Sequence, residues 1–176
     1  LGPGARVHPS ATVEACVLGK GVHIGAGAVV RGCVFGEGSK VEELAVCEGV
    51  VTGENALIQR QALIKYSVLG AESAIGGATQ LAVFAREASL KRGAFGMDQS
   101  LSGTVRYRVG ESLREAPYGL LGICLGEQTQ IGAGVSVGPG RLLEPGIVLV
   151  SDSLQTPLSG AKGLHRVRDG KMEPWS

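Results

Sequence analysis

The sequence opens with five consecutive copies of one 17-residue unit, which end at Val17, Val34, Val51, Val68 and Ala85. The second column of the unit is glycine in every copy, the seventh is Val or Ile, and the eleventh is small. The eleventh-column residues are Ala11, Ala28, Ala45, Ala62 and Thr79. A short fixed period predicts a solenoid, in which each unit buries its apolar face only by stacking on its neighbours. No other feature constrains the fold as strongly.

The columns within each unit also predict the local structure. Apolar or small residues recur in steps of six, as in Leu18-Gly19-x-x-Val22 followed by Ile24-Gly25-x-x-Ala28. An α-helix needs a period near 3.6 and tolerates glycine poorly, so the pattern excludes one. We therefore expect three short strands and three tight corners per unit, with aliphatic residues inward and small residues in the corners.

The repeat stops at residues 86–118, which we expect to form an irregular coil and an arm. Within this stretch Val105, Tyr107 and Val109 alternate with arginines, which predicts a half-exposed strand. A Gly-Glu turn follows the strand, so the simplest structure is a hairpin that projects from the solenoid. The hexapeptides return over residues 119–150.

The predicted domain organisation is therefore one β-helix domain over residues 1–150, with regular coils over 1–85, followed by a tail over 151–176. The beginning of the tail is rich in Ser, Pro, Gly and Lys and predicts a loop over 151–163. An Asp-Gly turn signal at 169–170 predicts a terminal hairpin.

Composition excludes several classes of partner. The formal net charge is +1, which gives no reason to expect nucleic acid. No apolar stretch is long enough to span a membrane and no signal-like start is present, so we expect a soluble, cytoplasmic protein.

The cysteines do not predict a metal site. Cys16, Cys33, Cys47 and Cys124 contain no Cys-x-x-Cys pair. Cys16 and Cys33 share a column in adjacent coils, where their Cα atoms would be about 4.8 Å apart and within reach of a disulfide. We expect them to be reduced, stacked side chains, because a cytosolic setting keeps thiols reduced. Cys47 occupies an inward column and is expected in the core.

The hexapeptide with a branched aliphatic residue, glycine and a small residue, as in Ile24-Gly25-x-x-Ala28, resembles that of left-handed parallel β-helix proteins. The best-known members are acyltransferases. The resemblance implies an all-β fold of triangular coils wound in the left-handed sense, a homotrimer or another homo-oligomer, and acetyl-CoA or another acyl-CoA as the candidate cofactor.

The second half is similar to the C-terminal β-helix of sugar-1-phosphate nucleotidyltransferases, some of which also carry amino-sugar N-acetyltransferase activity. The similarity lies in Thr104–Leu113, Gly119–Gly122 and Val137–Arg141. It implies a role in nucleotide-sugar metabolism, beside an N-terminal nucleotidyltransferase domain or a partner chain. The chain departs from the acetyltransferase members at Gln80–Ala85 and Arg92–Asp98, where their catalytic histidine and substrate asparagine would stand.

Candidate site residues follow from these departures. A uniform solenoid leaves only its irregularities free to build a concave pocket, so Gln80, Arg92, Asp98 and Arg106 are the candidate substrate-binding residues. The candidates for a general base are His8 and His23, which are otherwise solvated surface histidines. The third histidine, His165, lies in the tail.

A non-catalytic scaffold is the alternative function. In that case a flat face of the prism would mediate oligomerisation or dock a partner. The contacts would be the apolar residues near the break, which are otherwise core beneath the arm. These residues are Val83, Phe84, Phe95 and Tyr107.

Overall fold

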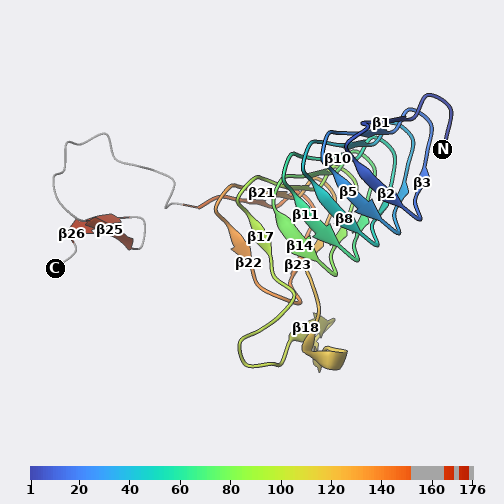
Figure 1. Cartoon of the computed structure of the whole chain (residues 1–176). Helices are drawn as coiled ribbons and strands as arrows, with labels where there is room; N and C mark the ends of the chain where they lie inside the picture. The colour runs from blue at the N-terminus through green and yellow to red at the C-terminus, as the bar shows by residue number, and fades with distance from the viewer. Residues whose placement is uncertain (152–164, 169–170, 175–176) are drawn as a thin grey trace.

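Three parallel sheets, here called A, B and C, wind around a common axis and form the three sides of a prism (Figure 1). The computed structural model describes residues 1–151 in full and the backbone of residues 165–168 and 171–174. Each coil contributes one strand to each sheet in turn, and sheet A contains eight strands.

The strands of sheet A pair in register from one end of the prism to the other. They are β1 (Arg6–Val7), β4 (His23–Ile24), β7 (Lys40–Val41), β10 (Leu57–Ile58), β13 (Ala74–Ile75), β16 (Ser89–Leu90), β21 (Gln130–Ile131) and β24 (Val148–Leu149).

Sheet B contains seven strands. They are β2 (Thr12–Glu14), β5 (Val29–Arg31), β8 (Val46–Glu48), β11 (Leu63–Lys65), β14 (Ala78–Gln80), β17 (Phe95–Gly96) and β22 (Ser136–Val137).

Sheet C also contains seven strands. They are β3 (Val17–Leu18), β6 (Val34–Phe35), β9 (Val51–Thr52), β12 (Val68–Leu69), β15 (Val83–Phe84), β20 (Cys124–Leu125) and β23 (Leu142–Leu143).

These pairings confirm the predicted fold class in its all-β composition, its parallel sheets and its three-sided coils. Within residues 1–151 the helical content is a single 3-10 turn, η1 (Pro117–Gly119). The predicted inward columns form the core: Ile24, Ile58 and Ile75 are at most 1 % exposed. Each such side chain contributes about 1.5–3 kcal/mol on burial, so the stacked columns stabilise the prism.

Glycine in the second column lets successive coils approach closely. A β-carbon at Gly19 would lie 2.9 Å from the carbonyl oxygen of Phe35 in the next coil. Real β-carbons essentially never come this close to another atom, so the column excludes any side chain.

The fifth coil is two residues shorter than the sequence alignment predicts. Val51 pairs with Val68, 17 residues later, but Val68 pairs with Val83, only 15 residues later. Thr79 therefore pairs with Ile64 in the inward column of sheet B rather than filling a corner, and Ala85 lies beyond the strand. The prediction of five uniform copies is wrong in the fifth, because Gly76-Gly77 makes a shorter corner there.

The sixth coil is interrupted after its second strand. β16 and β17 continue sheets A and B, and the chain then leaves the prism to form the predicted arm. The arm is an antiparallel hairpin of β18 (Arg106–Val109) and β19 (Ser112–Glu115), which Figure 1 shows projecting from the prism. After η1 the chain returns at β20 and resumes sheet C.

The base of the arm is fixed to the coils by buried packing and backbone hydrogen bonds. Val105 is 1 % exposed, and its carbonyl accepts a hydrogen bond of 2.8 Å from the Ala116 amide. The Gly140 amide donates to the carbonyls of Leu121 and Gly122 at 2.9 and 3.0 Å. Gly140 also lies against Val105 and Arg106, since a β-carbon there would be 3.0 Å from Val105 Cγ1 and from the Arg106 carbonyl oxygen. The base of the arm therefore packs on the last coils.

In the tail, β25 (His165–Arg168) and β26 (Lys171–Pro174) pair antiparallel, as the predicted terminal hairpin requires. The predicted loop over 151–163 falls almost entirely outside the described residues, as does the Asp-Gly turn at 169–170.

All four cysteines are free thiols. Cys47 is fully buried, which confirms its predicted place in the core. The Cys33 amide donates to Cys16 Sγ at 3.4 Å, so these two residues stack in one column.

Candidate functional site

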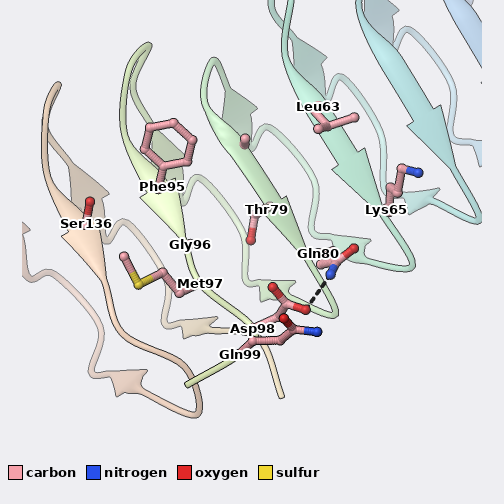
Figure 2. A pocket seen from close by; sticks show the side chains of 11 residues that line it. Leu63, Lys65, Thr79, Gln80, Phe95, Gly96, Met97, Asp98, Gln99 and Ser136 are labelled. Carbon is pink, nitrogen blue, oxygen red and sulfur yellow. Dashed lines mark hydrogen bonds between the residues drawn. The ribbon is translucent and has the colours of Figure 1, made fainter. Parts of the chain in front are cut away.

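A groove of about 540 Å³ lies on the outer surface of sheet B, where the fifth and sixth coils depart from the regular repeat. We call it the sheet B groove. Four neighbouring strands (β11, β14, β17 and β22) contribute to it, together with the segment that leaves β17 (Figure 2). Its lining residues are Leu63, Lys65, Ala78, Thr79, Gln80, Phe95, Gly96, Met97, Asp98, Gln99 and Ser136.

The groove follows from the outward column of sheet B. Leu63, Ala78, Phe95 and Ser136 are successive partners in register. The small Ala78 side chain lies between two large ones and leaves a depression in the surface. Leu63 and Phe95 stay 42 % and 52 % exposed, so the groove presents apolar surface to solvent. Met97 extends this surface where the chain turns towards the arm.

The polar end of the groove holds a hydrogen-bonded pair. The Gln80 Nε2 amide donates to Asp98 Oδ2 (Figure 2). Gln80 ends β14, and Asp98 is 18 positions later, about one coil along the prism. The bond is partly buried and leaves the Gln80 carbonyl oxygen and the second carboxylate oxygen of Asp98 available to a ligand. A carboxylate and an amide thus face the same cavity.

Lys65, on the adjacent strand, is already neutralised. Its Nζ lies 2.9 Å from Glu48 Oε2. Hydrogen bonds from Lys65 and Tyr66 hold the pKa of Glu48 below its ordinary value. Asp98 is the carboxylate that lines the groove, and it forms no ion pair within residues 1–151.

The structure separates the four candidate substrate-binding residues. Gln80 and Asp98 meet in the sheet B groove, whereas Arg92 lines a cavity of about 240 Å³ near the Gly76-Gly77 corner. Arg106 lies on the arm and forms an ion pair of 3.1 Å with Glu115.

The candidate histidines lie in the first two coils. His8 is exposed, and its Nδ1 hydrogen-bonds to Ser10 Oγ at 2.8 Å. His23 is exposed on the outer face of sheet A. Neither lines the groove, which is built from the fourth coil onward. The side chain of His165 lies outside the described residues.

The sequence analysis singled out Phe95 only as a contact of the alternative scaffold, and it did not identify Leu63, Met97 or Lys65, which also line the groove. The signal was present, because Leu63 and Lys65 occupy the outward columns one coil before Ala78 and Gln80. It was hidden by aligning the fifth coil at 17 residues instead of 15.

The residues proposed as scaffold contacts do not lie on one surface. Phe84 is 1 % exposed and belongs to the core, so it cannot contact a partner. Val83 is instead part of an exposed apolar column on the outer face of sheet C, which we call the valine column. Its members are Val17, Val34, Val51, Val68 and Val83, each between 43 % and 61 % exposed.

In the described part of the chain, no three His, Cys, Asp or Glu side chains gather closely enough to hold a metal ion. Among the same residues no helix has the length and apolar character needed to cross a bilayer.

No protein-family model matches the sequence, and no curated protein sequence matches it either. Solved structures do match. A hexapeptide transferase family protein from Anaplasma phagocytophilum is 17 % identical, with 80 % of this chain and 73 % of that chain covered and a TM-score of 0.33.

Two acetyltransferase structures give similar values. A Bacillus cereus protein with an inferred acetyltransferase assignment is 15 % identical over 82 % of this chain and 71 % of its own, with a TM-score of 0.38. The acetyltransferase domain of PglB from Neisseria gonorrhoeae, in complex with acetyl coenzyme A, is 17 % identical over 82 % and 56 %, with a TM-score of 0.28. These scores are too low to carry an argument, so the fold assignment rests on the strand pairing itself.

Proposed function

We propose that this chain is the β-helix domain of a transferase in nucleotide-sugar metabolism, and that the sheet B groove binds a hydroxyl-rich or amino-sugar ligand. The observation that carries the proposal is the hydrogen bond between Gln80 and Asp98, which holds an amide and a carboxylate side by side at the edge of apolar surface.

The chemistry of the groove suits a sugar. The Asp98 carboxylate accepts hydrogen bonds from hydroxyl groups or from an ammonium group, and the charge makes such bonds stronger. The Gln80 carbonyl oxygen accepts a second one. Phe95 and Leu63 offer apolar surface to the C–H face of a sugar ring or to an acyl group. A few polar groups fixed beside apolar surface are typical of small-molecule sites.

Acyl transfer to such a ligand would need a group that removes a proton from the attacking amine or hydroxyl. Asp98 is the ionisable groove residue placed for this task, since it is held by Gln80 and has no paired cation in the described residues. Acetyl-CoA or another acyl-CoA is the proposed donor. A nucleotidyltransferase domain, in the same protein or on a partner chain in the cytoplasm, would supply the nucleotide chemistry.

The test measures binding and turnover separately. Isothermal titration of the protein with glucosamine-1-phosphate and galactosamine-1-phosphate should give saturable binding of at least one sugar. Asp98→Ala should weaken it about tenfold or more, because a charge-assisted hydrogen bond is lost. Glu54→Ala, an exposed carboxylate outside the groove, is the matched control.

Turnover is then followed by release of the coenzyme A thiol from acetyl-CoA. Thiol release that requires both the sugar and Asp98 supports acyl transfer. Sugar binding without thiol release would remove catalysis and leave a binding domain. Equal affinities for the Asp98→Ala and Glu54→Ala proteins would contradict the assignment of the groove.

The second candidate function is assembly with further copies of this chain through the valine column, as a homotrimer or another homo-oligomer. The column runs along five coils of a flat sheet face, and such continuous exposed apolar surface is typical of interfaces. Light scattering should give a mass above that of one chain. Val51→Lys should shift the mass towards the monomer, because it places a charge in the middle of the interface, whereas Lys40→Ala on sheet A should not. A monomeric parent protein would exclude this assembly.

A further inference from the structure

The arm and the last coils enclose two cavities that share two arginines. The first, about 410 Å³, is lined by Ser100, Ser102, Thr104, Val105, Arg106, Pro139 and Arg141. The second, about 650 Å³, is lined by the same two arginines and also by Arg108 and Glu144. A β-carbon at Gly140 would lie 3.0 Å from the Arg106 carbonyl oxygen, so the last coil packs against the arm here, and Arg106 and Arg141 line the same two cavities.

The positive charge of the first cavity is only partly balanced. Arg141 makes no ion pair within residues 1–151. Arg106 donates to Glu115 through Nε and Nη2, both to the single oxygen Oε1. The Nη1 group of Arg106 therefore has no partner among these residues. No carboxylate of residues 1–151 lines the first cavity, whereas Glu144 lines the second. The first cavity is accordingly the better anion site.

Hydroxyl groups also line the first cavity. Ser100 Oγ and Ser102 Oγ hydrogen-bond to each other at 2.9 Å, and Thr104 lies two residues further along the same segment. A hydroxyl donates to an anion after a simple rotation about its C–O bond. Guanidinium groups match the geometry of phosphate oxygens, and two of them together neutralise a dianion.

We propose that this cavity, here called the arm site, binds the phosphate group of a phosphate monoester. Arg141 and the free edge of Arg106 bind the phosphate oxygens, and the Ser100–Thr104 segment donates hydroxyl hydrogen bonds. Glu115 weakens phosphate binding at the arm site, because its carboxylate already accepts hydrogen bonds from Arg106. The arm site is separate from the sheet B groove, so it stands or falls independently of the function proposed for that groove.

The experiment follows backbone amide shifts by NMR as the full-length protein is titrated with inorganic phosphate. Sodium chloride keeps the ionic strength constant, because screening alone would perturb surface charges. Amides of residues 100–106 and 140–141 should shift saturably. No sugar or acyl donor is present, so a negative result leaves the groove proposal untouched.

Three variants sharpen the test. Arg141→Gln should weaken phosphate binding about tenfold or more, since a charge-assisted contact is lost. Glu115→Gln should strengthen binding, because the whole Arg106 guanidinium becomes available. A misfolded protein cannot produce such a gain. Arg6→Gln, at an exposed arginine of the first coil outside the arm site, is the matched control and should bind phosphate like the parent.

Two results would overturn the proposal. One is a phosphate response that does not saturate or that is spread over all surface arginines. The other is an Arg141→Gln protein that binds phosphate as tightly as the Arg6→Gln protein.

Discussion

The Thr79 hydroxyl occupies the space that a side chain of Gly96 would need. A β-carbon at Gly96 would lie 2.5 Å from Thr79 Oγ1 and 2.6 Å from Ile123 Cδ1. Thr79 and Gly96 are neighbours in the inward column of sheet B, where other coils place Val30 or Ile64. The inward column of sheet B therefore holds only a threonine and a glycine where the arm leaves the prism. Thr79 Oγ1 is buried there, and no group within the described residues forms a hydrogen bond with it.

Replacing Thr79 by valine should stabilise the protein by about 1 kcal/mol, because burial of an unpaired hydroxyl is costly. Thr52 is the matched control, since both residues are 6 % exposed. Its Oγ1 accepts from the Gly36 amide at 3.1 Å and bonds to Ser39 Oγ at 3.1 Å. Thr52→Val should therefore destabilise by about 1–2 kcal/mol. Urea unfolding monitored by circular dichroism measures both changes, and a loss of stability in Thr79→Val would contradict the expectation.

The short fifth coil depends on Gly77. A β-carbon at this position would collide with the carbonyl oxygen of Ala94 in the next coil. Gly77→Ala should destabilise by about 1–3 kcal/mol, as overpacking does. In contrast, a β-carbon at Gly138 meets no atom within 4 Å. Gly138→Ala should be neutral or stabilise by up to about 1 kcal/mol, because it restricts the unfolded chain. Equal thermal stability of the two variants would show that the corner tolerates a side chain.

Glu48 should make stability depend on pH in the acid range. Its pKa is lowered by hydrogen bonds from Lys65 and Tyr66 and by the charge of Lys65. A depressed carboxyl pKa means that the stabilising contribution is present above the ordinary value of 4.5 and is lost as pH falls through the folded-state value. The melting temperature of Glu48→Gln should therefore fall less steeply than that of the parent on acidification below about pH 5.

The matched control for this measurement is Glu54→Gln, because Glu54 is exposed and makes no ion pair in residues 1–151. Its acid profile should follow that of the parent. Since the Glu48 pair is exposed to solvent, the difference should also shrink at high salt.

The four thiols should differ in reactivity towards a thiol reagent such as DTNB. Cys33 and Cys47 are buried, and desolvation raises the pKa of both thiols, so neither should react in the native protein. Cys16 and Cys124 are partly exposed. Desolvation also raises the pKa of Cys124, so this thiol should react more slowly than a free cysteine. Two thiols titrating natively and all four in urea is the expected result, and rapid native reaction of all four would contradict the burial.

Periodicity alone was sufficient to predict most of the fold. The six-residue steps gave the three strands per coil, the inward residues such as Ile24 and Val41, and the core position of Cys47. These features follow from local pattern, because inward positions are buried wherever coils stack and most of them are therefore apolar. The arm was also predictable, since alternation at Val105–Val109 differs from the hexapeptide pattern.

The sequence was a weaker guide to which side chains lie next to one another. The sequence singled out Gln80, Arg92, Asp98 and Arg106 only as residues near the break in the repeat. Their distribution over three places depends on which strand pairs with which and on where the chain leaves the prism. Arg141 was not among the predicted site residues for the same reason, because only the folded arm brings Arg106 and Arg141 to one cavity.

The sequence by itself thus determined the stacked-coil architecture, since a repeated apolar column has no other way to be buried. Only the tertiary structure decided the register of the fifth coil and the contents of the groove and the arm site. A two-residue shortening at Gly76-Gly77 changes which column every following residue occupies, and strand pairing fixes that register. The bond between Gln80 and Asp98 joins residues about one coil apart, and it forms because this register places them side by side.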